Sequence, residues 1–174
     1  LNFVISTKNQ LTMLFTFKSI SLFSAILFTG LSAGLFYAWA VSVIPGTQRV
    51  SDASYLENMQ QINRAILNPA FFAIFFGPLI ALGMSTIQFS PAHLAFWLFL
   101  AATVCYLIGT FGITAFGNVP LNDQLEILEL VDMEPSKAKN FRALYEHKWN
   151  RFHWLRTLAA VASFVLAILA AFLK

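Results

Sequence analysis

The chain has 174 residues, of which 58% are hydrophobic and only 11% are charged. Because a soluble domain carries about 25% charged residues, this composition excludes a water-soluble globular protein and indicates a polytopic membrane protein. The net charge of +3 suits contact with anionic lipid, and the sequence has no basic, aromatic-interleaved patch of the kind that nucleic-acid binding needs. Cys105 is the only cysteine, so an intramolecular disulfide and a cysteine metal cluster are excluded.

Four stretches are apolar over about the 20 residues that a helix needs to cross the bilayer. The chain is therefore expected to be an all-α membrane protein with a four-helix transmembrane bundle. The bundle forms a single domain over residues 19–174, preceded by a short N-terminal leader over residues 1–18. The expected spans are residues 19–44, 69–87, 92–116 and 152–173.

Glycine and proline mark the first two spans. Gly30 and Gly34 have the GxxxG spacing that lets another helix backbone approach closely. Gly77 and Pro78 in the second span predict a kink. The short polar turn QFSPAH makes the second and third spans antiparallel neighbours.

The first long connection, residues 45–68, predicts an amphipathic helix over residues 51–67. Apolar residues recur inside it at helical spacing. Ser51 or Asp52 is expected to cap its start, and Pro69 follows its end.

The second long connection, residues 117–151, begins with GNVPLND at the end of the third span. Pro120 lacks an N–H and suits the first turn of a new helix, with Asn118 as its cap. The third span is therefore expected to stop at Gly117, and an acidic helix is expected over residues 121–132. A break at MEPSK and a helix of mixed charge follow.

The distribution of basic residues predicts how the protein lies in its membrane. Eight of the 11 Lys and Arg residues belong to residues 45–68 and 117–156. The positive-inside rule then places both long connections in the cytoplasm and both termini outside, in a bacterial inner membrane.

Polar residues lie on one face of the fourth span at its membrane entry. Trp149, His153 and Arg156 are spaced i, i+4 and i+7. Because a charge at that depth is costly, Arg156 is expected to face the bundle interior beside a partner, and Asp123 is the nearest acid on the preceding connection. The alternative is an interfacial anchor, since Trp and Arg at a helix end are ordinary belt residues.

Two more polar clusters lie at the same side of the membrane. Asn63, Arg64 and Asn68 crowd the start of the second span. Asn122 follows Asn118 on the first turns of the acidic helix, whose N-terminus favours an anion. Three such clusters on one side indicate a site.

Four strings occur in the same order as in the anthrone oxygenase-like integral membrane proteins, a family that the chain resembles over about residues 27–170. The strings are GLFYAWAVSVIPG, MQQINRAILNPAF, GNVPLNDQL and WNRFHWLRTLAA. The resemblance implies a four-helix membrane fold and an oxidoreductase function. The positions that it carries over are Asn63, Asn68, Asn118, Asn122, Trp149, His153 and Arg156.

The resemblance favours a cofactor-independent oxygenase that acts on an apolar phenolic or anthrone-like small molecule. Loss of a proton turns such a substrate into a delocalised carbanion that reacts with O₂, so the protein needs a base, an anion-stabilising donor set and an apolar pocket, without a cofactor or metal. His153 is the expected base, oriented by Asp123. Arg156, Asn118 and Asn122 are expected to hold the oxyanion, and phenylalanines to enclose the ring.

Two alternatives stay open. One is a metal or haem site at His153 with His147, Asp123 or Glu126, although His147 and His153 do not share a helix face. The other is a non-enzymatic accessory or structural subunit of a membrane complex, or a homo-oligomer, in which the GxxxG face and the broken helix serve assembly. Metal analysis separates the first alternative from the oxygenase, and co-purifying chains identify the second.

Overall fold

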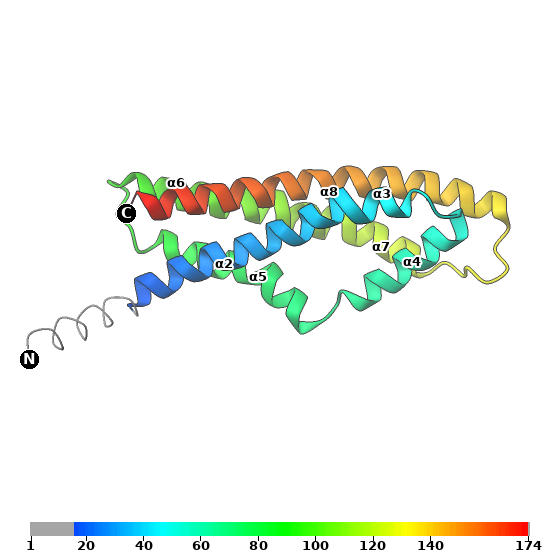
Figure 1. The fold of residues 1–174 in the computed structure, drawn as a ribbon, viewed down its shortest axis with the longest axis horizontal. Coiled ribbons are helices and arrows are strands. Elements are labelled where there is room, and N and C mark those ends of the chain that lie inside the picture. Colours follow the sequence, from blue (N-terminus) through cyan, green and yellow to red (C-terminus); the bar gives the residue numbers. More distant parts are fainter. Residues whose placement is uncertain (1–15, 174) are drawn as a thin grey trace, which may run out of the picture.

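The computed structural model describes residues 16–173, so the expected leader lies almost wholly outside the described residues. Within that range every regular element is a helix. Four helical runs are long and apolar enough to cross a membrane, which confirms the all-α polytopic fold (Figure 1). The runs are Phe17–Thr47, Pro69–Thr86, Leu94–Glu126 and Pro135–Phe172.

The first two runs are separated by one additional helix. The first run comprises α2 (Phe17–Ala38), the π-helix η1 (Trp39–Val43) and the short α3 (Ile44–Thr47). The additional helix is α4 (Asp52–Ala65), and Ser51 caps it as predicted by accepting a hydrogen bond from the Ser54 backbone N–H at 3.3 Å. The second run is α5 (Pro69–Thr86), which continues on both sides of Pro78.

The third run continues past the predicted end of its span. It comprises α6 (Leu94–Val104), the π-helices η2 (Cys105–Gly112) and η3 (Thr114–Asn118), and α7 (Val119–Glu126). The predicted stop at Gly117 is therefore wrong. Asn118 has helical backbone angles and makes no capping hydrogen bond, so the predicted cap is wrong as well.

The π-helical turn explains how the helix passes a proline. The Val119 N–H donates to the Thr114 carbonyl, which lies one residue further back than in an α-helix. This wider turn moves the preceding carbonyls away from the ring of Pro120, which would otherwise clash with them.

The fourth run is the single helix α8 (Pro135–Phe172), with 38 residues. The helix of mixed charge and the fourth span, which were predicted as separate elements meeting at residue 152, are therefore one element. No proline or glycine occurs after Pro135 to interrupt it. As a result, the residues on one face of α8 keep a fixed spacing from the charged end of the molecule into the membrane core.

The helices pack around α2 and α8. α5 packs against α2, while α6 and η2 pack against α8. In Figure 1, α4 and α7 lie together at one end of the bundle, where both contact α8. An apolar core that includes Phe75, Leu82 and Phe99 fills the membrane part, and a second core that includes Tyr55 and Leu125 lies between α4, α7 and α8.

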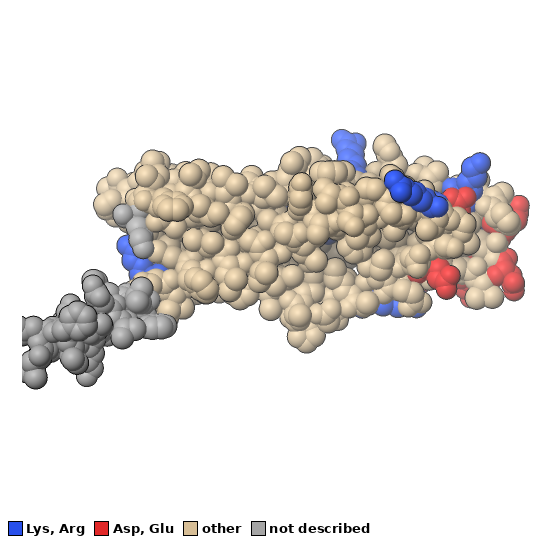
Figure 2. Space-filling view, in the orientation of Figure 1, with Lys and Arg blue, Asp and Glu red and all other residues tan. Residues whose placement is uncertain are grey.

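Surface charge gathers toward the ends of the molecule. Figure 2 shows acidic and basic side chains toward the end that holds α4 and α7, and a smaller basic group at the opposite end. The face between them is almost free of charge, as contact with lipid requires. Large apolar side chains are exposed on the spans, among them Phe23, Ile80 and Leu158.

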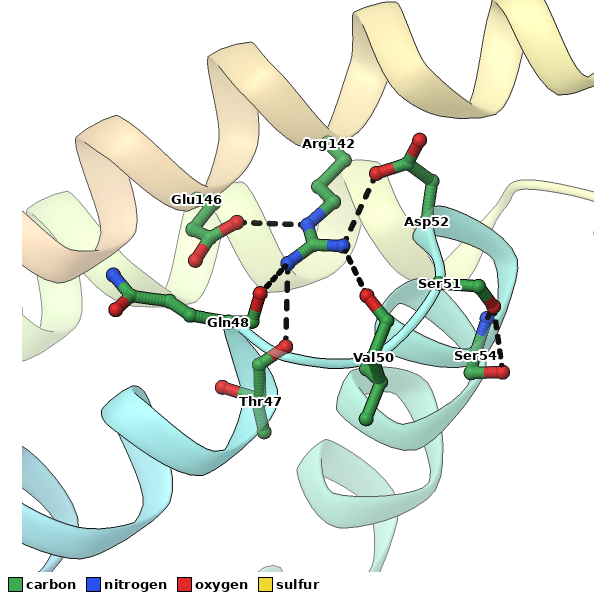
Figure 3. A network of polar contacts seen from close by, with 8 residues as sticks. All are labelled: Thr47, Gln48, Val50, Ser51, Asp52, Ser54, Arg142 and Glu146. Carbon is green, nitrogen blue, oxygen red and sulfur yellow. Dashed lines mark hydrogen bonds and ion pairs between the residues drawn. The ribbon is translucent and has the colours of Figure 1, made fainter.

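Arg142 joins α8 to the connection between α3 and α4 (Figure 3). Its Nη1 donates to the Val50 carbonyl at 2.8 Å, and its Nη2 donates to the Thr47 carbonyl at 3.2 Å. The carboxylates of Asp52 and Glu146 lie 3.1 and 2.8 Å from the guanidinium and supply the counter-charge. We call this set of contacts the Arg142 clamp.

The Arg142 guanidinium also lies over the ring of Tyr55, 4.4 Å from its centroid. Tyr55 is buried, and this burial, together with the nearby Glu146 carboxylate, raises the pKa of its phenol above the ordinary value. The phenol therefore stays neutral. The clamp thus fixes the end of the first run and the start of α4 against α8.

A buried polar contact joins three spans in the membrane core. The hydroxyl oxygens of Ser32 and Tyr106 lie 2.7 Å apart, and the Tyr106 hydroxyl donates to the Phe75 carbonyl at 3.1 Å. Because water is scarce at this depth, the three polar groups satisfy one another. The contact ties α2, η2 and α5 together.

Among the glycines, the tightest contact with another helix lies at Gly109 in η2 rather than at the predicted GxxxG pair. A Cβ atom on Gly109 would overlap the Cβ of Ala159 in α8, whereas a Cβ on Gly34 would meet nothing within 4 Å. A Cβ on Gly30 would lie 3.0 Å from the ring of Phe164. Glycine is therefore required at 109 by the contact between η2 and α8.

We expect Gly109→Ala to lower the free energy of unfolding by about 1–3 kcal/mol, because the added methyl group has no space beside Ala159. Gly34→Ala is the matched control and should be neutral or stabilising, because alanine favours a helix more than glycine does. Thermal unfolding of both variants in the same detergent measures the difference. Equal stability of the two variants would contradict the contact between η2 and α8.

Candidate functional site

A cavity of about 310 Å³ lies where the membrane spans meet α4 and α7. Volumes of this size hold small organic ligands. Aromatic side chains of the first run, Phe36 and Trp39, and polar side chains of α8 form its deep wall. Arg64 of α4 and Glu126 of α7 belong to its rim. The cavity therefore extends from the apolar interior of the bundle to the charged end of the molecule.

The deep wall presents flat aromatic faces. Trp149 stacks on His153 with the ring centroids 5.1 Å apart and the planes 6° from parallel. The Trp39 ring lies 6.0 Å from that of Trp149, and Phe36 meets His153 edge-on at 6.1 Å. Such a wall suits a planar aromatic ligand.

Both ring nitrogens of His153 are engaged. Its Nε2 lies 3.0 Å from the Phe36 carbonyl, and since a carbonyl only accepts, Nε2 carries the proton. The Nδ1 lone pair accepts hydrogen bonds from Arg156, at 3.3 Å from Nε and 3.0 Å from Nη2. This hydrogen-bond pattern assigns the neutral Nε2–H tautomer to His153.

Arg156 is a buried cation without a carboxylate partner. Apart from His153 it donates only to Thr114 Oγ1, at 3.3 Å, and its guanidinium lies 4.7 Å from the Phe36 ring centroid and 5.2 Å from that of Trp149. None of the ion pairs among residues 16–173 involves it. Two of its five N–H groups have no acceptor in the described part of the chain. An uncompensated buried charge is costly, so the cavity favours an anion at this position.

Asn122 and Asn63 place amide groups at the cavity. The Asn122 Oδ1 accepts from Trp149 Nε1 at 2.8 Å and from the Tyr145 hydroxyl at 3.2 Å. Asn63 Nδ2 is buried and makes no hydrogen bond of ordinary geometry among the residues described. The structure therefore brings Asn63, Asn122, Trp149, His153 and Arg156 to one cavity.

Asn68 and Asn118, in contrast, lie outside the cavity lining. Asn68 caps α5, because its Oδ1 accepts from the Phe71 N–H at 3.0 Å. Asn118 is buried and donates from Nδ2 to the Trp149 carbonyl at 3.2 Å. Both side chains therefore hold helices in place around the cavity.

The rim carries the acidic side chains. Arg64 and Glu126 form an ion pair at 2.8 Å that joins α4 to α7 and is about half exposed. Asp123 lines the rim and is exposed. The predicted orientation of His153 by Asp123 is not what the structure has, since Phe36 and Arg156 take both ring nitrogens.

The metal-ligating residue types do not gather. Within residues 16–173 no three His, Cys, Asp or Glu side chains are close enough to hold one ion. His147 is exposed on α8, and His93 precedes α6 at the opposite end of the bundle from the cavity.

Sequence reasoning missed Phe36, Trp39, Thr114 and Tyr145. Tyr145 is four residues before Trp149 on the same face of α8, so the same helical spacing would have found it if α8 had been predicted to begin at Pro135. Phe36, Trp39 and Thr114 lie in apolar runs that give no polar signal, and π-helical turns place two of them.

A family model described as anthrone oxygenase matches residues 69–166, which is more than half of the chain. The matched segment runs from the start of α5 into α8 and includes Asn122, Trp149, His153 and Arg156. Neither the curated proteins nor the solved structures gave a match to this chain.

We expect Arg156→Met to leave the unfolding temperature unchanged or to raise it, because methionine fills the space without a buried, uncompensated charge. Arg142→Met is the matched comparison on the same helix. It should lower the free energy of unfolding by about 3 kcal/mol, because it deprives Asp52 and Glu146 of their partner. Thermal unfolding of both purified variants measures this. A large loss of stability in Arg156→Met would show that the guanidinium is satisfied and structural.

Proposed function

The chain belongs to the anthrone oxygenase family, which suggests an oxygenase-type function, and we propose that it is a cofactor-independent membrane oxygenase acting on an apolar phenolic or anthrone-like substrate. The observation that carries the proposal is the uncompensated guanidinium of Arg156 in an aromatic cavity. A substrate that becomes an oxyanion during the reaction supplies the missing counter-charge.

The cavity matches such a substrate in shape and polarity. Phe36, Trp39 and Trp149 line the cavity with aromatic rings, which suit contact with a fused ring system. Arg156 and Asn122 offer N–H donors at the same wall, and a developing oxyanion is stabilised most by donors that are already in position. The acids Asp123 and Glu126 stay at the rim, so the interior is left to the negative charge of the substrate.

The reaction begins with removal of a proton from the CH₂ group that lies between two aromatic rings. The resulting carbanion is delocalised onto the ketone oxygen, which becomes the oxyanion that Arg156 holds. One electron passes from the carbanion to O₂, and the radical and superoxide so formed combine into a peroxide anion. The peroxide takes up a proton and loses water, which leaves a second ketone. One O₂ is consumed and one water released for each CH₂ oxidised to C=O.

His153 is the proposed base, and substrate binding itself sets it free to act. In the structure its Nδ1 lone pair is bonded to Arg156. The ketone oxygen of the bound substrate accepts from the N–H groups of Arg156 and so releases this lone pair for the substrate proton. The protonated His153 then supplies the proton that the peroxide anion takes up.

The arrangement of the chain supports a location for this chemistry. Basic side chains gather at the end of the bundle that holds the cavity (Figure 2). By the positive-inside rule, we place this end and both long connections on the cytoplasmic side of a bacterial inner membrane. The substrate then reaches the cavity by partitioning into the lipid.

We expect His153→Ala to lower the turnover of 1,8-dihydroxyanthrone by about 10²-fold or more, the usual contribution of a general base. Arg156→Lys should lower turnover to a similar extent, because the point charge of lysine does not reproduce the planar array of N–H donors of a guanidinium. His93→Ala, at the far end of the bundle, is the control and should retain turnover. The assay follows O₂ uptake and the absorption of the quinone product, corrected for oxidation without protein.

Two results would contradict the proposal. One is wild-type turnover in His153→Ala and Arg156→Lys together with intact folding. The other is that the wild-type protein itself consumes no more O₂ than the protein-free control while the substrate remains soluble.

A further inference from the structure

The orientation of the Asn122 side chain is determined by two donors. Its Oδ1 accepts from Trp149 Nε1 at 2.8 Å and from the Tyr145 hydroxyl at 3.2 Å. An indole nitrogen only donates, so the atom that faces it is the amide oxygen. The amide nitrogen is then on the other side of the group. It makes no hydrogen bond to the described residues, and Asn122 lines the cavity.

Tyr145 itself does not line the cavity. It is 2% exposed, with its ring stacked 5.9 Å from that of Phe141 and edge-on to that of Tyr55 at 6.3 Å. Its hydroxyl has Asn122 as its hydrogen-bond acceptor. The Asn63 amide, which also lines the cavity, interacts with the same hydroxyl. The hydroxyl therefore acts on a ligand through these two amides, and the hydrogen bond of regular geometry is the one to Asn122.

Asn122 and Arg156 present their donors beside the same indole. Asn122 bonds to the nitrogen edge of Trp149, and the Arg156 guanidinium lies over the ring, 5.2 Å from its centroid. The exposed acids of the cavity, Asp123 and Glu126, belong to the rim. This wall therefore offers donors to a ligand and has no carboxylate to compete for them.

We propose that Tyr145 and Trp149 are positioning residues that turn the Asn122 amide nitrogen toward the cavity. The site then selects a flat ligand with two acceptor oxygens on one edge, one anionic at Arg156 and one at Asn122. This inference rests on the proposed function for the place of the site, but it concerns binding and does not depend on the reaction with O₂.

The test measures binding and turnover separately. The binding probe is 1,8-dihydroxyanthraquinone, which is already oxidised and carries a ketone oxygen between two phenolic oxygens. Its visible absorption moves to longer wavelength when a phenol ionises, so a titration reports both affinity and the bound anion. Turnover of 1,8-dihydroxyanthrone gives KM and kcat.

We expect Tyr145→Phe to weaken probe binding by about five- to tenfold, the usual effect of one lost hydrogen bond in a binding site. KM should rise by a similar factor while kcat changes by less than about twofold, because the lost interaction acts on substrate and transition state alike. Asn122→Asp keeps both acceptor contacts but replaces the donor by a negative charge. It should abolish binding of the ionised probe.

Tyr55→Phe is the matched control, because it removes a buried hydroxyl from the neighbouring ring without touching Asn122. It should bind the probe as the wild type does. Equal weakening in Tyr55→Phe and Tyr145→Phe would overturn the inference, as would wild-type affinity in Tyr145→Phe or retained binding of the ionised probe in Asn122→Asp. Failure of the wild type to bind the probe would overturn it too.

The two proposals fail in different ways. In one case the wild type binds the probe, Tyr145→Phe binds it more weakly, and no dihydroxyanthrone is turned over. This result supports the positioning role and contradicts the oxygenase function. In the other case turnover depends on His153, while Tyr145→Phe keeps the wild-type affinity for the probe and the wild-type KM. This result supports the oxygenase function and contradicts the positioning role.

Discussion

The site depends on one rigid element, the uninterrupted helix α8, which runs from the charged end of the molecule into the membrane core. One face of it carries Arg142, Tyr145, Trp149, His153 and Arg156 in succession. A straight helix holds such residues at fixed heights along its axis. The Arg142 clamp, the Asn122 amide and the Arg156 guanidinium therefore keep fixed positions relative to one another. The other helices arrange themselves against this face: the first run meets it at Phe36 and Trp39, and the third at Thr114, Asn118 and Asn122.

The sequence carried enough information to predict this face but not the full length of its helix. Trp149, His153 and Arg156 have a spacing that only a helix places on one side, and the cost of a charge in the membrane determines which way that side faces. The Ser51 cap also follows from local chemistry, because a serine hydroxyl accepts a hydrogen bond from a backbone N–H in the first turn of the helix. Such signals depend on residues that are close in the sequence, and so they can be read without the fold.

Predictions failed where packing overrode a local signal. Pro120 and Asn118 are suited to start a helix, yet η3 accommodates the proline within a continuous run, and Asn118 donates to the Trp149 carbonyl instead of capping a helix. Gly30 and Gly34 have the spacing of a close contact, but only the fold reveals that Gly109 faces Ala159. His153 bonds to the Phe36 carbonyl, which is far away in the sequence, and to Arg156. Arg156 was expected to pair with a carboxylate instead.

The Arg142 clamp also has a consequence for motion. It ties the junction of α3 and α4 to α8 through backbone carbonyls, so this junction is attached directly to α8. The corner between α4 and α5 is tied differently. Among the described residues Leu67 is 66% exposed, Asn68 bonds only within the corner, and the half-exposed Arg64–Glu126 ion pair beside it joins α4 to α7 instead of α8. If the cavity opens to admit a bulky ligand, we therefore expect the corner between α4 and α5 to move relative to α8.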